Sequence, residues 1–276
     1  MRKTLLILPL LAMMPITSHA EGSDDGALWT EIGIQKSLNK QWKVGLETEM
    51  RAQKEARWSL GANATYKPVK YLRLGVAYNF QYRKHPETDK PHYTKDEDHE
   101  YDGFNRTEKY WSPRHRISID ATGTVKVGGW LRLSLRERYQ FTRRVETDYT
   151  RTKFRCEEKY GPNGYYYEWE DPESEDRTKP AESDHVLRSR LKLEMDKRHC
   201  PWSPFLSVET HNSLNSGQKL NLEKVRTGIG CDYKINKQHS IGLAYIFTAY
   251  IHDEEDSHQR LHERVHAVSI GYQFDF

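Results

Sequence analysis

Arginines and carboxylates occupy alternate positions in several segments, a spacing that could place them on one wall of a passage. Between residues 186 and 197, Arg188 and Arg190 alternate with apolar or small residues, and Glu194 continues their face. A ring of like charge in a narrow, low-dielectric pore selects its counter-ions, so an arginine excess favours anions. Mixed charges can instead pair and fill the interior. The candidates are Arg73, Arg116, Arg136, Arg188, Arg226, Glu47, Glu49 and Glu194.

Catalysis is a second interpretation of the polar residues, because a nucleophile needs a base beside it. His211 lies two residues from Ser213, and His185 and His239 stand near expected strand ends. With thirteen histidines in the chain, some serine–histidine proximity arises by chance, and no spacing matches a known outer-membrane phospholipase or protease. We therefore assign no catalytic residue, and we expect no cofactor.

The elements that position these residues have a period of two. In 71–83 the even positions are all apolar or aromatic, from Leu72 to Tyr82, while the odd ones include Arg73 and Asn79. This alternation predicts strands with one apolar face, and no stretch has helical periodicity. The expected strands are 27–37, 41–53, 56–66, 71–84, 113–126, 130–145, 185–198, 204–213, 222–234, 239–252 and 264–276.

The connections between these strands fall into two classes. Tight links at 38–40, 67–70, 127–129, 198–204 and 236–238 alternate with long hydrophilic ones at 85–112, 146–184, 211–221 and 252–263, apart from a short link near Lys54. Short periplasmic turns and long external loops are typical of outer-membrane barrels. Residues Gly161 to Gly164, followed by Tyr165 to Trp169, predict a hairpin in the largest loop.

Aromatic residues near strand ends agree with membrane interfaces. The candidate interface aromatics are Trp42, Trp58, Trp111, Trp130 and Trp202. On the last strand, Tyr272, Phe274 and the terminal Phe276 share one face, which resembles the assembly signal of bacterial outer-membrane barrels. We therefore expect outer-membrane lipid and the barrel-assembly machinery as partners.

Two details do not fit strict rules. Eleven strands are expected, whereas a closed antiparallel barrel needs an even number, so 27–37 could enter the lumen, pair partially, or accompany a missed twelfth strand. Alternation also places Glu137 on the lipid side, where charge is costly. A bulge there would turn it away.

The N-terminus and the composition limit the class of protein. Arg2 and Lys3 precede an apolar run, and Ala20 ends a plausible cleavage site, so residues 1–20 are expected to be a signal peptide and 21–276 one barrel domain. Without Arg2 and Lys3 the chain has 41 cations and 40 anions, too balanced for a nucleic-acid binder. The three cysteines, Cys156, Cys200 and Cys231, fit neither a disulfide framework nor a zinc site.

Six loose motifs together resemble the domain-of-unknown-function 2490 family. They are 28–32 (Leu-Trp-Thr-Glu-Ile), 42–51 with its Leu46-Glu47 core, 114–116 (Arg-His-Arg), 130–138, 187–191 (Leu-Arg-Ser-Arg-Leu) and 266–276. The resemblance implies an outer-membrane barrel with no assigned activity and supplies no catalytic residues.

The sequence therefore predicts an all-β, closed, up-and-down transmembrane barrel of about 10–12 strands in the outer membrane of a Gram-negative bacterium. Its expected role is that of a small porin-like channel with a cationic lumen favouring anionic solutes. The alternatives are a plugged structural barrel, a barrel-embedded enzyme acting on lipid, and a secreted soluble β-sandwich that binds a ligand. The oligomeric state stays open.

Overall fold

The computed structural model describes residues 24–94, 100–162, 164–197, 199–215, 221–251 and 264–276. The predicted signal peptide and the loop at 252–263 lie outside these residues. Every regular element described is a strand: β1 (Asp24–Ser37), β2 (Trp42–Ala52), β3 (Arg57–Val69), β4 (Leu72–His85), β5 (Thr88–Tyr93), β6 (Tyr101–Thr107), β7 (Tyr110–Val127), β8 (Leu131–Arg144), β9 (Thr147–Gly161), β10 (Gly164–Trp169), β11 (Glu173–Lys179), β12 (Glu182–Met195), β13 (Trp202–Ser213), β14 (Asn221–Lys234), β15 (His239–Tyr250) and β16 (Arg264–Asp275).

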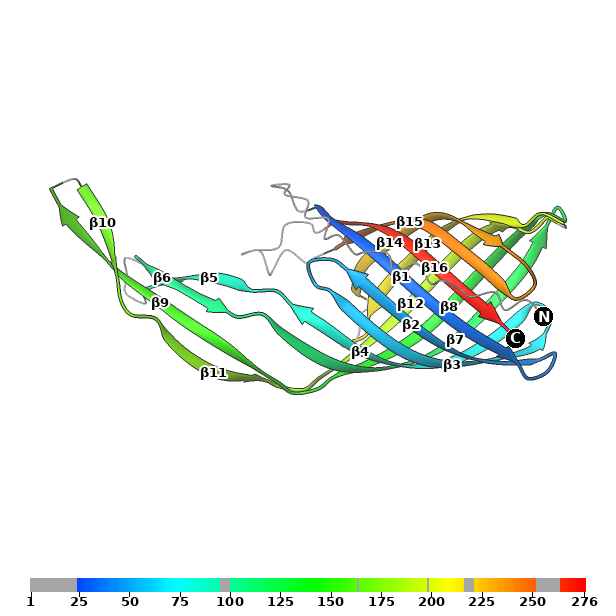
Figure 1. Ribbon diagram of the computed structural model, residues 1–276, viewed down its shortest axis with the longest axis horizontal. Helices are drawn as coiled ribbons and strands as arrows, with labels where there is room; N and C mark the ends of the chain where they lie inside the picture. Colours follow the sequence, from blue (N-terminus) through cyan, green and yellow to red (C-terminus); the bar gives the residue numbers. More distant parts are fainter. Residues whose placement is uncertain (1–23, 95–99, 163, 198, 216–220, 252–263) are drawn as a thin grey trace, which may run out of the picture.

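Eleven of these strands close into a barrel, in the order β1-β16-β15-β14-β13-β12-β8-β7-β4-β3-β2 (Figure 1). Neighbours along the chain are neighbours in the barrel, apart from the strands inserted between β4 and β7 and between β8 and β12. The all-β barrel prediction is confirmed, and the eleven predicted strands match the barrel strands to within three residues at each end.

The barrel closes through a parallel pair, β1 with β16, whose register runs from Asp24↔Arg264 to Gln35↔Asp275. Antiparallel neighbours alternate in direction, so an odd number leaves the first and last strands pointing the same way. The expectation of an even strand number is thus wrong. β1 is a full wall strand, also paired with β2, and neither enters the lumen nor implies a twelfth strand.

The two faces of the wall differ in chemistry. Large aliphatic side chains are exposed on the outside of the barrel strands, such as Leu46 (59 % exposed), Ile119 (59 %) and Leu243 (57 %). Among the described residues, the buried set comprises fourteen polar or charged residues and only five hydrophobic ones. The barrel is therefore polar inside and apolar outside, the reverse of a soluble core.

Tight turns gather at one end of the barrel. The Asn39 side-chain carbonyl accepts hydrogen bonds from the backbone N–H groups of Gln41 and Trp42, both at 2.8 Å. Gly128 and Gly129 have φ of 60° and 75°, the left-handed conformation that a tight hairpin turn of this twist requires. The predicted short links and long links therefore lie at opposite ends of the strands.

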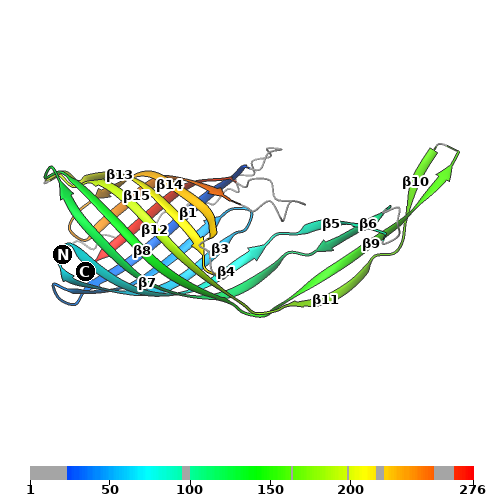
Figure 2. The same cartoon turned by 180° about the vertical axis from the view of Figure 1, so that it is seen from behind.

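Five further strands build an extension beyond the long-link end, where long loops and one hairpin were expected (Figures 1 and 2). β9 pairs with β6, β10 and β11, and β5 pairs with β6. The predicted hairpin after Gly161 is confirmed, with Gly161 paired to Gly164. Sequence reasoning missed β5, β6 and β11 because their polar residues lack the apolar alternation of the barrel strands.

Glu137 stays on the outer face of β8. The register through Ala121↔Glu137 and Ser189↔Glu137 is continuous, so the bulge expected there is absent. The Ser189 hydroxyl instead donates a 2.6 Å hydrogen bond to the Glu137 carboxylate.

Among the residues described, no helix has the length and apolar character needed to cross a membrane.

Candidate functional site: a charged cavity in the lumen

A cavity of about 590 Å³ occupies the barrel interior. Its lining comes from strands all round the wall, and its charged groups are nine arginines and six carboxylates, without a lysine or a histidine. The charged residues of this lining are Arg51, Arg57, Arg73, Arg116, Arg136, Arg138, Arg188, Arg190, Arg226, Glu31, Glu47, Glu49, Asp120, Glu209 and Asp232.

Strand register concentrates the cations on one wall, formed by β8, β12, β13 and β14. One paired row crosses these strands as Arg136–Arg190–Glu209–Arg226. The adjacent row, two residues along each strand, reads Arg138–Arg188–His211–Lys224. Because residues two apart share a face, five arginines and one lysine surround one carboxylate on this wall, which we call the basic wall.

Glu209 is the centre of the basic wall. Its carboxylate lies 2.7 Å from the guanidinium of Arg188, 3.1 Å from that of Arg136 and 3.7 Å from that of Arg226. His211 Nε2 is a fourth partner at 2.8 Å. Only 5 % of the Glu209 side chain is exposed, so these charge-assisted bonds are largely shielded from water.

Carboxylates concentrate on β1 and β2, where Glu31 and Glu49 are paired residues. Glu49 accepts hydrogen bonds from Arg51 (2.7 Å) and from Arg57 (2.6 Å). The Arg51 guanidinium also lies 3.7 Å from the ring centroid of Trp29, a cation–π distance. We call the part that contains Glu31, Glu47 and Glu49 the acidic wall.

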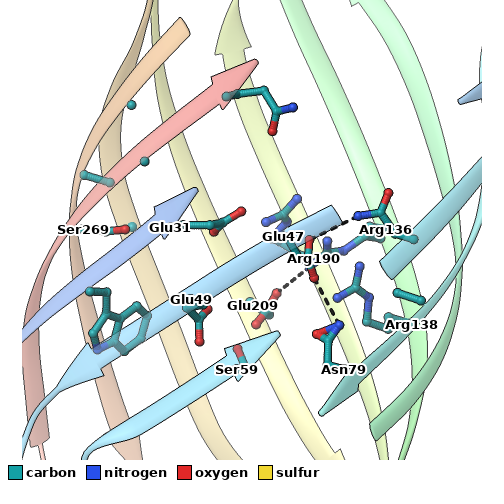
Figure 3. Close-up of a pocket in the computed structure, with 18 of the residues that line it drawn as sticks. Glu31, Glu47, Glu49, Ser59, Asn79, Arg136, Arg138, Arg190, Glu209 and Ser269 are labelled. Carbon is teal, nitrogen blue, oxygen red and sulfur yellow. Dashed lines mark hydrogen bonds and ion pairs between the residues drawn. The ribbon is translucent and has the colours of Figure 1, made fainter. Parts of the chain in front are cut away.

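Several lining groups have no partner of opposite charge. Among the described residues, Glu31 and Glu47 form no ion pair, and neither do Arg73, Arg116 and Arg190. Figure 3 shows Glu31 and Glu49 extending from strands at one side of the cavity and Arg136 and Arg138 from strands at the other. Uncompensated charge therefore faces the cavity from both walls.

Amide side chains solvate the unpaired carboxylate of Glu47. Asn79 donates to one oxygen at 3.2 Å and Asn63 to the other at 3.3 Å. The sequence placed Asn79 on a polar strand face and did not single out Asn63. Their shared acceptor followed only from the register of β2, β3 and β4, which sequence alternation does not supply.

The charged side chains of the lining differ in exposure. The side chain of Asp232, two residues before the end of β14 at the short-turn end, is 43 % exposed. At Arg136 the exposed fraction is 12 % and at Glu209 it is 5 %. The lining side chain of Asp232 is therefore open to solvent, whereas Arg136 and Glu209 are shielded from it.

A comparison of the whole chain with protein families finds a match to the model described as "Protein of unknown function (DUF2490)", over residues 26–259. The chain belongs to the DUF2490 family. The resemblance expected from the sequence motifs is thus confirmed. No curated protein matches this DUF2490 chain.

Two solved structures are similar to the DUF2490 barrel. The translocator domain of autotransporter NalP from Neisseria meningitidis is 10 % identical, with a TM-score of 0.45, 78 % of this chain covered and 70 % of that chain. The β domain of the Bordetella autotransporter BrkA is 12 % identical, with a TM-score of 0.43, 84 % of this chain covered and 79 % of that chain.

Seven of the eight lumen candidates predicted for the DUF2490 chain line the cavity: Arg73, Arg116, Arg136, Arg188, Arg226, Glu47 and Glu49. The eighth, Glu194, lies outside the lining and pairs with Lys192 at 2.9 Å. Lys192 is 3.5 Å from Asp232, which does line the cavity. Trp29 is a lining residue that the sequence predictions did not include. Its indole contacts Arg51 on the neighbouring strand and Arg226 on β14. The contact with Arg226 depends on barrel closure.

The five candidate interface tryptophans are all exposed at 40–53 %, and they are Trp42, Trp58, Trp111, Trp130 and Trp202. Trp42 stacks on Tyr66 with ring centroids 4.7 Å apart, and Trp111 stacks on Tyr82 at 5.1 Å. Aromatic pairs of this kind carry large apolar area with a polar edge.

Serine and histidine do not assemble into a nucleophilic site at the predicted place. His211 bonds Glu209 and not Ser213, and Ser213 is buried. A different contact, which the sequence analysis missed, joins His85 Nε2 and the Ser112 hydroxyl at 2.9 Å. Ser112 is fully buried, so its hydroxyl is closed to a substrate.

The described residues of the DUF2490 chain contain no cluster of three or more His, Cys, Asp or Glu side chains arranged to hold a metal ion. Cys156, Cys200 and Cys231 are free thiols.

Proposed function

We propose that this chain is an outer-membrane β-barrel whose lumen conducts small anions. The observation that carries the membrane location is the reversed polarity of the wall. Exposed aliphatic side chains stand on all eleven barrel strands, whereas soluble proteins rarely expose contiguous apolar surface beyond a few hundred Å². A hydrocarbon environment is the solvent that such a surface fits.

The excess of arginine in the cavity supports anion preference. Nine arginines against six carboxylates leave three uncompensated positive charges along the lining. Low-dielectric walls focus this field, which raises the local concentration of anions. Arg73, Arg116 and Arg190 contribute most directly, since no carboxylate within ion-pair distance neutralises them among the described residues.

Planar-bilayer recording of the refolded chain tests this function. Under a salt gradient, we expect discrete conductance steps. Their reversal potential should shift towards the equilibrium potential of the anion. The double variant Arg73→Glu/Arg190→Glu breaks no ion pair and should reverse the preference. The control is Lys159→Glu, a single charge reversal on the β9–β10 hairpin outside the lumen, which should leave selectivity unchanged. Unaltered selectivity in the double variant would remove the two arginines from the conducting path.

A plugged structural barrel is the second candidate, favoured by one observation. Three arginines and a histidine converge on the buried Glu209 carboxylate inside the lumen, and such a cluster can close a small barrel. If the chain is demonstrably inserted in the bilayer but gives no conductance steps, this result would support the plugged barrel over the channel.

The C-terminal strand supports a proposal about assembly. β16 ends at the short-turn end, where the backbone N–H of Phe276 donates to Gln35 O (2.9 Å) and its carbonyl accepts from Ser37 N (3.2 Å). We propose that Tyr272, Phe274 and Phe276 are read by the barrel-assembly machinery after secretory export, before β16 closes on β1. Deletion of Phe276 should lower the yield of membrane-inserted barrel in cells, while refolding in detergent persists.

A further inference from the structure

Three outward clusters near the long-link end of the barrel repeat one geometry. A Tyr-x-Phe sequence on one strand meets a histidine on the next, the histidine directly opposite the phenylalanine and hydrogen-bonded through Nδ1 to the tyrosine hydroxyl. The clusters are Tyr78, Phe80 and His115 (2.7 Å), Tyr139, Phe141 and His185 (2.6 Å), and Tyr245, Phe247 and His266 (2.6 Å).

All three clusters lie at the long-link end of the barrel, at the border of the apolar outer band. Tyr78 and Ile117 are paired neighbours, 44 % and 45 % exposed, and His115 follows two residues closer to the strand end. Tyr139 is 39 % exposed and His185 stands likewise beyond Leu187. Polar rings immediately beyond an apolar band are where lipid head groups would lie.

The hydrogen bond orients each imidazole. When Nδ1 accepts the tyrosine O–H, the neutral ring keeps its proton on Nε2, which becomes a donor. Among the described residues, Nε2 of His115 and of His185 has no hydrogen-bond partner. These two rings therefore present N–H groups away from the tyrosine.

Arg143 adds a permanent charge between them. It is the direct strand partner of His115 on β7 and of Ser183 on β12, and it follows Phe141 by two residues on the outer face of β8. Its guanidinium donates one hydrogen bond, to the Ser183 hydroxyl at 2.9 Å, and no carboxylate pairs with it among the described residues. His115, Arg143 and His185 thus form a donor patch across three adjacent strands.

We propose that this patch binds the phosphate of a lipid head group in the leaflet around the long-link end. The inference rests on the membrane location in the proposed function. Exposed arginine and imidazole N–H groups match phosphate oxygens as acceptors, and the apolar band below them accommodates the acyl chains. The aliphatic and aromatic side chains of β7 and β8, such as Ile119 and Tyr139, supply that apolar surface.

Native mass spectrometry of the barrel, released from nanodiscs of mixed phosphatidic acid and phosphatidylcholine, tests the proposal. The natural chain should retain phosphatidic acid preferentially. Arg143→Gln should lower that retention about fivefold, because one basic residue at an anionic surface contributes on this scale. The triple variant with His115→Gln and His185→Gln added should lose the preference.

A matched control lies at the short-turn end of the barrel. His239 repeats the motif with Tyr272 (2.6 Å) and Phe274, beside the short turns and without an arginine opposite it. His239→Gln should therefore leave phosphatidic acid retention unchanged. An equal loss in His239→Gln, or full retention in the triple variant, would overturn the lipid site.

Insertion is measured on the same samples by resistance to carbonate extraction. A chain that inserts but shows no lipid preference would refute this inference alone. A chain that fails to insert would refute the membrane location and the lipid site together.

Discussion

Among the described carboxylates of the cavity lining, Glu209 has the most charged partners, and its burial makes them interdependent. Three guanidinium groups within 3.7 Å share this one acceptor. Removing one member of a buried ion cluster leaves the others without compensation, which costs more than the pairing itself contributed. The stability of the barrel should therefore depend strongly on Glu209.

Glu209→Gln should lower the free energy of unfolding by about 3–5 kcal/mol, because Arg136, Arg188 and Arg226 would stay buried without their counter-charge. Urea unfolding of the refolded barrel, followed by tryptophan fluorescence, measures this. Asp196→Asn is the control: its partners Lys126 and Arg132 lie at 2.6 Å, but the site is more exposed, so about 1 kcal/mol or less is expected. Equal losses in both variants would contradict a buried cluster.

Glu137 gives a residue-scale test of the outer face. Among the described residues, the Ser189 hydroxyl is the hydrogen-bond partner of its carboxylate, and the neighbouring outward residues of β8, Leu135 and Tyr139, are apolar or aromatic. Glu137→Leu should raise the free energy of unfolding in a lipid bilayer by up to about 2 kcal/mol, since a charge leaves the hydrocarbon. Glu194→Leu, on the inner face and paired with Lys192, should lower it. A loss of stability in Glu137→Leu would argue for a wet environment there.

Sequence alternation assigned the face of Glu137 but could not find the contacts of Glu209. Strict period two placed Glu137 on the outer face, and the structure keeps it there without a bulge. The convergence on Glu209 was not foreseeable, because it requires the registers of β8, β12, β13 and β14 together. A single-residue shift in any of them would reverse its faces.

At the scale of elements, apolar alternation located the barrel strands, because each must present one apolar face. The extension strands carry no such requirement and left no signal of period two. Apolar alternation also could not predict the parallel seam between β1 and β16, because the direction of that pairing depends on which strands close the barrel. The odd number of predicted strands showed only that the closure was unusual, and the parallel pairing of β1 with β16 explains how the barrel closes.

Cross-linking tests the seam. In a cysteine-free background, Thr30→Cys with Ile270→Cys should be joined by a short bifunctional thiol reagent, because these residues are paired across β1 and β16. Ile34→Cys with Val268→Cys is the control, offset by six residues, or about 20 Å along a strand. Electrophoresis before and after reduction measures the joined fraction. Efficient joining of the offset pair would contradict the parallel register.

Acid should loosen the extension. Hydrogen bonds from Arg106 hold the pKa of the Asp89 carboxyl below its usual value, and those from Arg177 do so for Glu175. A lowered folded-state pKa stabilises the fold above the unfolded-state pKa, about 4, and this contribution is lost as pH falls. Amide exchange, corrected for intrinsic rates, should therefore rise in β5, β6 and β11 on acidification. Arg106→Gln should weaken the response around Asp89, and an unchanged response there would contradict this cause.

At the scale of the whole molecule, the barrel and the extension are separable in their strand pairing. The extension strands pair only with one another, while β4 pairs directly with β7 and β8 with β12. The long insertions thus leave the barrel at adjacent strand ends and return to them. The wall that encloses the charged cavity does not require the extension for any of its strand pairs.

Removing the extension should therefore leave a closed barrel. His85 pairs with Tyr110 and Arg144 with Glu182, so replacing 86–109 and 145–181 by Asn-Gly turns joins strand ends that already face each other. We expect the shortened chain to refold in detergent with the strand signal of the barrel in circular dichroism and with anion-selective conductance retained. The deletion removes five strands together with the aromatic residues of the β9–β10 hairpin, so the near-ultraviolet signal should fall and the far-ultraviolet signal should keep the barrel's share. A shortened chain that fails to close would show that the extension guides strand pairing during folding, because no pair in the finished wall depends on it.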